Sequence, residues 1–419
     1  MIRIINSEEK ELLEKIKKRS TADFDLVLSR IKPIIRDIRI KGDKALSYYS
    51  EKIDSFKLTK NNTEITEAEI KRAYKKVDKK TIQAFKKAKS NIKRYSKLQM
   101  PKGWSKEVEK GITLGQLIRP IEKVGCYIPA GRYPLPSSVL MTATIAKVAG
   151  VKEVIICTPP RTNNHEILVA ADIAGVDRVF RVGGAQSIAA MAYGTGTIPK
   201  VDKIVGPGNI YVTAAKKLVY GDVGIDFLAG PSEILIIAEK GNPRFIAADM
   251  LSQAEHDNLA SAIFITTKKN LAEKVKKELN KQLKGLDDIT TQEAIRKYSA
   301  IIIAKNIDDA FKISNDIAPE HLEIISEDGK LLNKVKNAGA VFLGEYSCES
   351  AGDYCSGPSH VLPTSGNSKQ RAGLSVYDFI KMPSFQKITR SGLRKLKGTI
   401  TRIADVEGLK AHKKSAEIR

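Results

Sequence analysis

Cysteine and histidine are both scarce in this chain of 419 residues, which contains four Cys and five His. The cysteines are Cys126, Cys157, Cys348 and Cys355, and no two of them form a CxxC pair. This spacing excludes a zinc ribbon and a thioredoxin-type redox motif. We therefore expect reduced thiols that are mostly buried, with Cys348 and Cys355 closest to chemistry because they flank Asp353.

Long hydrophobic runs are absent as well. No apolar stretch reaches the ~18 residues that would indicate a membrane-spanning helix. The first ten residues, MIRIINSEEK, lack the basic and then apolar layout of a signal peptide and are typical of the start of a folded helix. These features predict a soluble cytoplasmic protein with no membrane partner.

Acidic residues are too few to balance the basic ones. Lys and Arg number 71 against 48 Asp and Glu, which gives a net charge of +23. Such a balance could indicate nucleic-acid binding, but the lysines alternate with acidic and apolar residues, as on the solvated face of a helix. Aromatic residues make up only 6% of the chain, so few side chains can stack on bases. We expect a Lys-rich enzyme surface and no nucleic-acid partner.

The length of the chain predicts two or three domains. Up to about Met100, apolar residues such as Phe24, Val27 and Ile31 recur at helical spacing. From Gly111 onward, short β-rich runs alternate with helices, which predicts a parallel sheet with crossover helices. The expected strands are 123–129, 153–158, 178–182 and 203–205, then 233–238, 262–266, 300–304 and 340–344 in a second α/β unit.

Two of the expected strand-to-helix turns are rich in glycine, residues 183–186 (GGAQ) and 206–209 (GPGN). Glycine lets a phosphate approach the backbone, and the following helix N-terminus supplies amide donors. Ligands in such sheets bind at the carboxyl ends of the strands. Neither turn matches GxGxxG, so the turns leave two interpretations open, a dinucleotide site or tight turns without a ligand.

Four of the five histidines lie in short runs crowded with carboxylates, amides, Gly and Pro. They are His256, His321, His360 and His412, whereas His165 lies elsewhere. Neutral imidazole is the commonest metal ligand and titrates closest to neutral pH. A chain so poor in histidine has little reason to place four of them in this way for packing. The pattern predicts an enzyme with a metal site and an acid/base site, both mostly in its second half.

Gln253 and His256 lie three residues apart in a segment, 245–259, that is predicted to be helical, so we expect them on one face. Such a pair could bind one metal ion, or it could simply lie on the surface. Asp353 and His412 favour the metal, because a set of nitrogen and oxygen ligands suits zinc.

Glu320 and His321 follow a helical run that is predicted to end near Ile317. Adjacent Glu and His side chains after a helix end would be mobile enough to reach a substrate, with Pro319 as a restraint. They offer two proton-transfer groups of different pKa. The alternative is that the two residues are neighbours by chance.

Several long stretches closely resemble histidinol dehydrogenase. They are AGPSE (229–233), LSQAEHD (251–257), APEHLE (318–323), ESAGDY (349–354), HVLPT (360–364) and EGLxxH (407–412). The resemblance runs in order from about residue 20 to the end. Cys348 stands where the family often has Pro, and the charge is unusually basic.

The resemblance implies a zinc-requiring, NAD-dependent enzyme that oxidises L-histidinol to L-histidine in two steps through L-histidinal. The zinc ligands, one ion per subunit, would be Gln253, His256, Asp353 and His412. His321 would take the hydroxyl proton, and Glu320 would activate water for the second oxidation. Further substrate contacts would be Ser232, His360 and Glu407, and the cofactor contacts Tyr127, Gln186 and Asn209. The family's subunits are intertwined, so a homodimer is expected in which His412 comes from the partner chain.

The expected fold is α/β, with two incomplete Rossmann-like, parallel-sheet units. We expect an N-terminal helical segment (1–20), a first α/β domain (21–126 with 233–374) that carries the zinc and acid/base motifs, a second (127–232) with the cofactor contacts, and a C-terminal helical arm (375–419). The main alternative function is a related zinc and NAD dehydrogenase of another small alcohol, such as a sulfonated diol. A zinc hydrolase is disfavoured because the sequence lacks HExxH.

Overall fold

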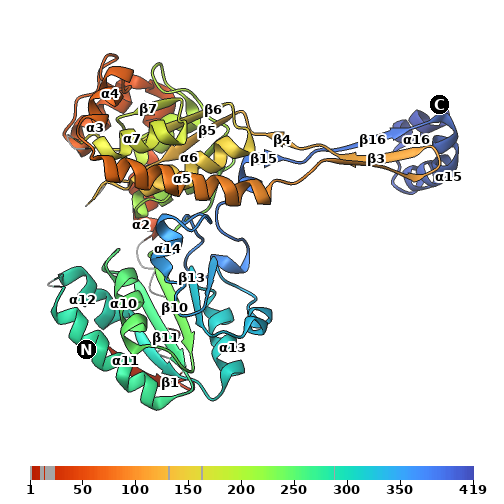
Figure 1. Cartoon of the computed structure of the whole chain (residues 1–419). Helices are drawn as coiled ribbons and strands as arrows, with labels where there is room; N and C mark the ends of the chain where they lie inside the picture. Colours follow the sequence, from red (N-terminus) through yellow and green to blue (C-terminus); the bar gives the residue numbers. More distant parts are fainter. Residues whose placement is uncertain (1, 10–13, 15–23, 131–132, 162–163, 287) are drawn as a thin grey trace.

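The computed structural model describes residues 2–9, 14, 24–130, 133–161, 164–286 and 288–419. Two α/β lobes lie one above the other, and an arm extends from the upper lobe with the C-terminus at its tip (Figure 1). Each lobe is built around a parallel sheet, and two small antiparallel sheets lie along the arm. The prediction of an α/β protein with two parallel-sheet units is confirmed.

The first sheet has five parallel strands in the order β7-β6-β5-β8-β9. Their bounds are β5 Lys123–Tyr127, β6 Glu153–Cys157, β7 Arg178–Phe180, β8 Lys203–Val205 and β9 Gly224–Ile225. The strands are short apolar runs because helices cover both faces of the sheet. Strands β6 and β7 are added on one side of β5, and the chain then crosses to the other side of β5 to form β8 and β9. This incomplete Rossmann order places a topological switch point between β5 and β8.

Among the described residues, four helices pack on each face of this sheet. One face is covered by α4 (Glu67–Tyr74), α5 (Lys79–Gln99), α6 (Pro136–Ala149) and α7 (His165–Ala174). The other is covered by α2 (Phe24–Lys41), α3 (Asp43–Asp54), α8 (Gly184–Tyr193) and α9 (Ile210–Val219). The early helices thus share their buried cores with the first sheet, whereas the predicted domain boundaries group residues 21–126 with residues 233–374.

The second sheet has six parallel strands in the order β1-β12-β11-β10-β13-β14. Their bounds are β1 Arg3–Asn6, β10 Glu233–Ala238, β11 Ser261–Thr266, β12 Ala300–Ile303, β13 His321–Ile325 and β14 Ala340–Leu343. One face packs on α10 (Pro243–Ala254), α11 (Lys269–Lys284) and α12 (Ile289–Tyr298), and the other on α13 (Ile307–Ile317) and the 3-10 helix η1 (Gly329–Lys334). From β10 to β14 the strand order is the same as in the first sheet, with the switch point between β10 and β13.

The first described residues correct the predicted N-terminal helix of residues 1–20. Arg3–Asn6 forms β1, which pairs in parallel with β12 at the edge of the second sheet. Ile2 and Ile5 are buried there, because β-branched side chains fit a pleated, apolar surface. Residues 10–13 and 15–23 of the predicted helix lie outside the described residues.

The arm is only partly helical, so the prediction for residues 375–419 is wrong in its first part. The strands of the arm are β2 (Trp104–Glu109), β3 (Ile112–Gln116) and β16 (Ser384–Ile388) in one antiparallel sheet, and β4 (Arg119–Pro120) with β15 (Ile380–Lys381) in another. Its tip consists of α15 (Arg390–Val406) and α16 (Lys410–Glu417) (Figure 1). The chain stays extended at β16 because β3 offers a ladder of backbone partners.

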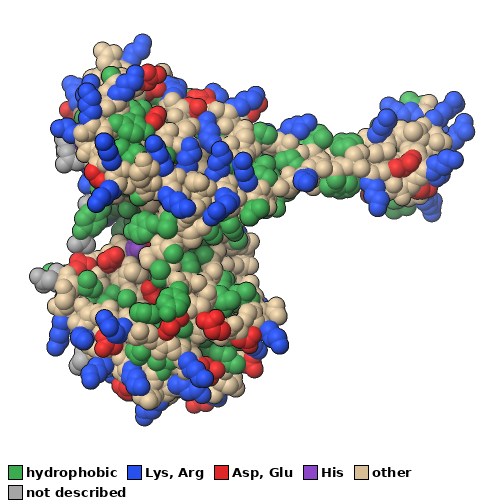
Figure 2. Space-filling view, viewed as in Figure 1, with side chains coloured by type: hydrophobic (Ala, Val, Ile, Leu, Met, Phe, Trp, Pro, Cys, Tyr) green, Lys and Arg blue, Asp and Glu red, His purple; other side chains and the backbone are tan. Residues whose placement is uncertain are grey.

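Across the described ranges, no helix has the length and apolar character needed to cross a bilayer. Lys and Arg side chains are spread over both lobes and the tip of the arm on the face that Figure 2 shows.

Candidate active site

Glu320 and His321 lie where β13 begins beside β10. Glu320 Oε2 accepts a hydrogen bond from the backbone N–H of Glu233 at 2.9 Å. His321 Nδ1 lies 3.0 Å from the carbonyl oxygen of the same Glu233. A carbonyl oxygen only accepts, so Nδ1 carries a proton and Nε2 is the ring nitrogen that can accept another. Both side chains are buried, at 7% and 3% exposure, so the expectation of a mobile pair is wrong.

Burial and charge shift the pKa values of this pair. Burial raises the pKa of Glu320 to about 8, although the nearby His321 acts to lower it. Burial alone would lower the pKa of His321, but Glu320 and Asp353 outweigh it and raise that pKa to about 10. The pair therefore holds two proton-transfer groups in unusual charge states, which is typical of active sites.

The short helix α14 (Glu349–Tyr354) adds two carboxylates. His321 Nε2 lies 3.8 Å from Glu349 Oε1 and 3.6 Å from Asp353 Oδ1. In the part of the chain that the structure describes, these three residues form a group whose potential ligand atoms all lie within 4.8 Å of one another. Such a group can hold a metal ion.

His256 and Gln253 extend this group. His256 Nε2 lies 3.6 Å from Asp353 Oδ2. Gln253 is 1% exposed, and its Oε1 has no hydrogen-bond partner among the described residues. A buried amide oxygen without a partner costs free energy. The adjacent Ser252 donates to Glu349 Oε2 of α14 at 3.2 Å, so this end of α10 lies beside the group, and a cation bound there would supply the missing partner. The nitrogen and oxygen donors of these three predicted ligands therefore fit a zinc ion.

The predicted helical face shared by Gln253 and His256 needs a correction. Helix α10 ends at Ala254, so His256 lies in the turn beyond it. His256 Nδ1 lies 3.1 Å from the carbonyl oxygen of Ser252. With Nδ1 held in this way, Nε2 faces Asp353. The orientation of the ring therefore comes from the turn and not from a shared helical face.

His360 and Ser232 connect the cluster to the first lobe. His360 Nδ1 lies 2.9 Å from the carbonyl oxygen of Asp353, and its Nε2 lies 3.3 Å from Ser138 Oγ. Ser138 belongs to the first turn of α6, which follows β5, so the carboxyl edge of the first sheet adjoins the cluster. Ser232 directly precedes Glu233, whose backbone holds the acid/base pair. The cluster thus lies between the lobes, where Figure 2 shows a hollow with a histidine side chain.

Glu407 and His412 lie elsewhere in the chain. Glu407 directly follows α15 and His412 belongs to α16, and both helices form the tip of the arm, well away from α14 (Figure 1). A single chain therefore does not bring the predicted substrate contact Glu407 and the predicted zinc ligand His412 to the other site residues.

The three predicted cofactor residues lie at the carboxyl edge of the first sheet. Tyr127 ends β5 and its hydroxyl accepts a hydrogen bond from the N–H of Gly184 at 3.3 Å. Gln186 in α8 is buried and donates through Nε2 to Asp54 Oδ2 at 2.9 Å. The Asn209 side chain caps the N-terminus of α9. These residues surround the switch point beside two helix N-termini, which suits a phosphate-bearing dinucleotide.

Glu349 and Asp54 were not predicted as site residues. Glu349 lies four residues before Asp353 in one helix, so the helical i, i+4 spacing could have identified it. Asp54 accepts a hydrogen bond from Gln186, which lies 132 residues further along the chain. No local sequence pattern predicts such a contact.

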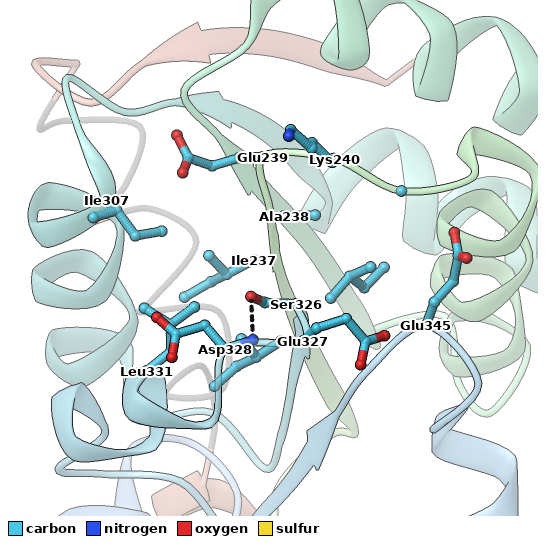
Figure 3. A pocket seen from close by; sticks show the side chains of 13 residues that line it. Ile237, Ala238, Glu239, Lys240, Ile307, Ser326, Glu327, Asp328, Leu331 and Glu345 are labelled. Carbon is cyan, nitrogen blue, oxygen red and sulfur yellow. Dashed lines mark hydrogen bonds between the residues drawn. The ribbon is translucent and has the colours of Figure 1, made fainter.

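A separate cavity of about 480 Å³ lies at the other end of the second sheet. Its lining comes from the carboxyl ends of β10 and β13 and includes Glu239, Glu327, Asp328 and Glu345 (Figure 3). His321 stands at the opposite, amino end of β13. The cavity is therefore distinct from the acid/base cluster, and none of its lining residues is a predicted site residue.

This chain resembles known proteins over its whole length. A family model described as histidinol dehydrogenase matches residues 17–419. The histidinol dehydrogenase of Clostridium acetobutylicum is 48% identical over 100% of this chain and 99% of its own length, and that of Methanothermobacter thermautotrophicus is 46% identical over 96% of both. A crystal structure of histidinol dehydrogenase from Elizabethkingia anophelis superposes with a TM-score of 0.93 at 38% identity, covering 100% of this chain and 97% of that one. With its whole length matched in sequence and in fold, the chain belongs to the histidinol dehydrogenase family and is an oxidoreductase.

Proposed function

We propose that this protein oxidises L-histidinol to L-histidine through L-histidinal, by two successive hydride transfers to NAD, with one zinc ion per subunit. The observation that carries the proposal is the buried pair Glu320 and His321 beside the donor group around Asp353. Family membership supplies the substrate, since the relatives are named for histidinol. The reaction completes histidine biosynthesis, and a cytoplasmic location stays a prediction.

Gln253, His256 and Asp353 would hold the zinc ion together with His412 from a second copy of the chain. When bound, zinc would supply a Lewis acid that helps to bind and orient the substrate. Ser232, His360 and Glu407 would complete the contacts with the substrate. Hydride transfer is the chemistry of the cofactor, which would lie against Tyr127, Gln186 and Asn209.

His321 would act as the base of the first oxidation. The carbonyl of Glu233 fixes Nδ1, so Nε2 is the atom that would take the hydroxyl proton as hydride leaves the carbinol carbon. Against the effect of burial, the surrounding carboxylates raise the pKa of His321 to about 10, so this role requires the positive charge of a bound cation to lower that pKa. Glu320 would act in the second oxidation, where its carboxylate would draw a proton from the water that adds to the aldehyde. The shared anchor on Glu233 keeps the two groups side by side, with Glu320 Oε2 3.7 Å from His321 Nδ1.

The first test is an absorbance assay for NADH. Purified, zinc-loaded protein with NAD should form NADH from L-histidinol, with two NADH for each L-histidine, because both oxidations use the same cofactor. A sulfonated diol should give no NADH above background. Turnover of the diol without turnover of histidinol would replace the proposed substrate with that of the alternative dehydrogenase.

Removal of one zinc ligand should remove the metal. His256→Ala should lose its bound zinc by elemental analysis and its activity, because the ion would lose a nitrogen donor beside Asp353. His165→Ala changes the histidine outside the site and serves as the matched control that keeps zinc. A chelator should abolish wild-type activity and added zinc should restore it. Full activity of metal-free wild-type protein would disprove a zinc requirement.

Glu320 and His321 should have separable effects. His321→Asn should slow histidinol oxidation most, and Glu320→Gln should slow oxidation of supplied histidinal most, each by roughly 100- to 10,000-fold. Glu320 must be ionised to act as a base, and its pKa is raised to about 8, so histidinal oxidation should accelerate as pH rises from 6 to 9. A bound cation would shift this rise to lower pH without reversing it. Glu320→Gln should lack the rise, and equal effects of both variants on both steps would contradict the assignment.

The active site should be shared between two chains of a homodimer. The motivation is that His412 lies at the tip of the arm, away from Asp353 in the same chain. In a hybrid of one His256→Ala chain and one His412→Ala chain, one site would carry both lesions and the other would carry neither. The hybrid should therefore recover activity that both parent homodimers lack. A verified hybrid without activity would show that both ligands come from one chain.

A further inference from the structure

The turn of residues 206–209 is held by a buried ion pair that neither the acid/base cluster nor the predicted cofactor contacts include. Lys216 and Asp226 form this pair, and their side chains are 3% and 0% exposed. Lys216 Nζ donates to the carbonyl oxygen of Gly206 at 3.1 Å. The N–H of Gly206 donates to Asp226 Oδ2 at 2.8 Å. The two charged groups thus bind both backbone polar groups of the same glycine.

Gly206 occupies a position that tolerates little movement. Its φ of +116° lies in the region that favours glycine, and a Cβ there would lie 2.2 Å from the carbonyl oxygen of Tyr127. Tyr127 ends β5 and Gly206 directly follows β8, so this contact closes the switch point of the first sheet. Asn209, three residues further on, caps α9. The position of Gly206 therefore influences how far apart Tyr127 and Asn209 lie, and both are predicted cofactor residues.

The acidic partner is itself fixed by its surroundings. Asp226 Oδ1 accepts a hydrogen bond from the N–H of Phe227 at 2.7 Å, and the Arg371 guanidinium donates to the carbonyl oxygen of Asp226. Arg371 also lies over the Phe227 ring, with Cζ 4.8 Å from the ring centre, and pairs with Asp378 at 2.6 Å. These contacts restrain the backbone of Asp226 and one oxygen of its carboxylate, while the other oxygen accepts from Gly206.

Stability alone does not account for a buried ion pair. Desolvation of two charges offsets much of their attraction, and apolar side chains of similar size often stabilise a core as well. What apolar side chains could not supply is a donor for the Gly206 carbonyl and an acceptor for its N–H. The gain that is specific to this pair is therefore the geometry of the turn.

We propose that Lys216 and Asp226 are positioning residues that fix the turn of residues 206–209 for the dinucleotide cofactor. This inference rests on the proposed use of NAD. Neither side chain touches the cofactor in this assignment. They act through the backbone of Gly206, so their loss should affect cofactor binding and leave histidinol binding in place.

The test compares Lys216→Met with Lys217→Met in zinc-loaded protein. Both changes remove one lysine charge from α9, but Lys217 is exposed and its Nζ lies over the Phe24 ring, 5.1 Å from the ring centre. Calorimetry should show NAD binding weakened on the order of 10- to 100-fold in Lys216→Met, because small misplacements of a preorganised site have effects of this size. Histidinol binding should stay within about twofold of the wild type, since the second lobe is unchanged. Lys217→Met should bind both as the wild type does.

Hydrogen exchange gives a readout without any ligand. Peptides covering residues 204–212 should exchange faster in Lys216→Met than in the wild type, whereas peptides of β10 and β13 should not change. If Lys216→Met does not fold, the double variant Lys216→Met/Asp226→Asn leaves no buried charge without a partner and carries the same test.

Unchanged NAD affinity with unchanged exchange in residues 204–212 would overturn the positioning role. Equal loss of NAD and histidinol binding, with faster exchange in both lobes, would also overturn it in favour of a general structural role. A wild-type protein that binds histidinol but not NAD would instead overturn the proposed cofactor, and the exchange result would still show whether the ion pair holds the turn.

Discussion

The acid/base site depends on the backbone of one residue. The N–H of Glu233 binds Glu320 and its carbonyl binds His321, and both groups are in place because β10 pairs with β13 in the register that sets Ile234 opposite His321. A shift of one residue in this register would turn the side chains of β13 to the opposite faces of the sheet. The ring of His321 is one of the three potential metal ligands, with Glu349 and Asp353, so the geometry of that group depends on this register.

Charge explains why the cluster holds together although it is buried. Burial alone would raise the pKa of Asp353, but His256 and His321 hold it well below its ordinary value. Burial raises the pKa of Glu349 to about 7, and Asp353 adds to that rise. Carboxylates and imidazoles thus hold one another in defined protonation states. An added cation would favour the ionised carboxylates and release protons from the group.

Sequence patterns predicted the parts of the fold in which the local sequence preference for a strand or helix agrees with the tertiary structure. Strands β5 to β8, β10 to β12 and β14 were predicted because buried parallel strands are continuous apolar runs. The strand that begins at His321 was missed, because polar residues at its start mask its apolar pattern. Strand β16 of the arm was missed because its partner, β3, lies far away along the chain. The sequence motifs likewise predicted most residues of the candidate site. They did not predict that α10 ends before His256 or that Glu349 lies close to His321, because both features depend on tertiary packing.

The two sheets share one strand order yet are used from opposite edges. The predicted cofactor residues lie at the carboxyl edge of the first sheet, whereas the acid/base pair lies at the amino edge of the second. The carboxyl edge of the second sheet, with its cavity, is left outside the catalytic region. In the proposed function, two units of like topology therefore have separate roles, one binding the oxidant and the other the reacting alcohol. Such an arrangement would let mutation alter substrate preference in one half while the half that binds the oxidant keeps its shape.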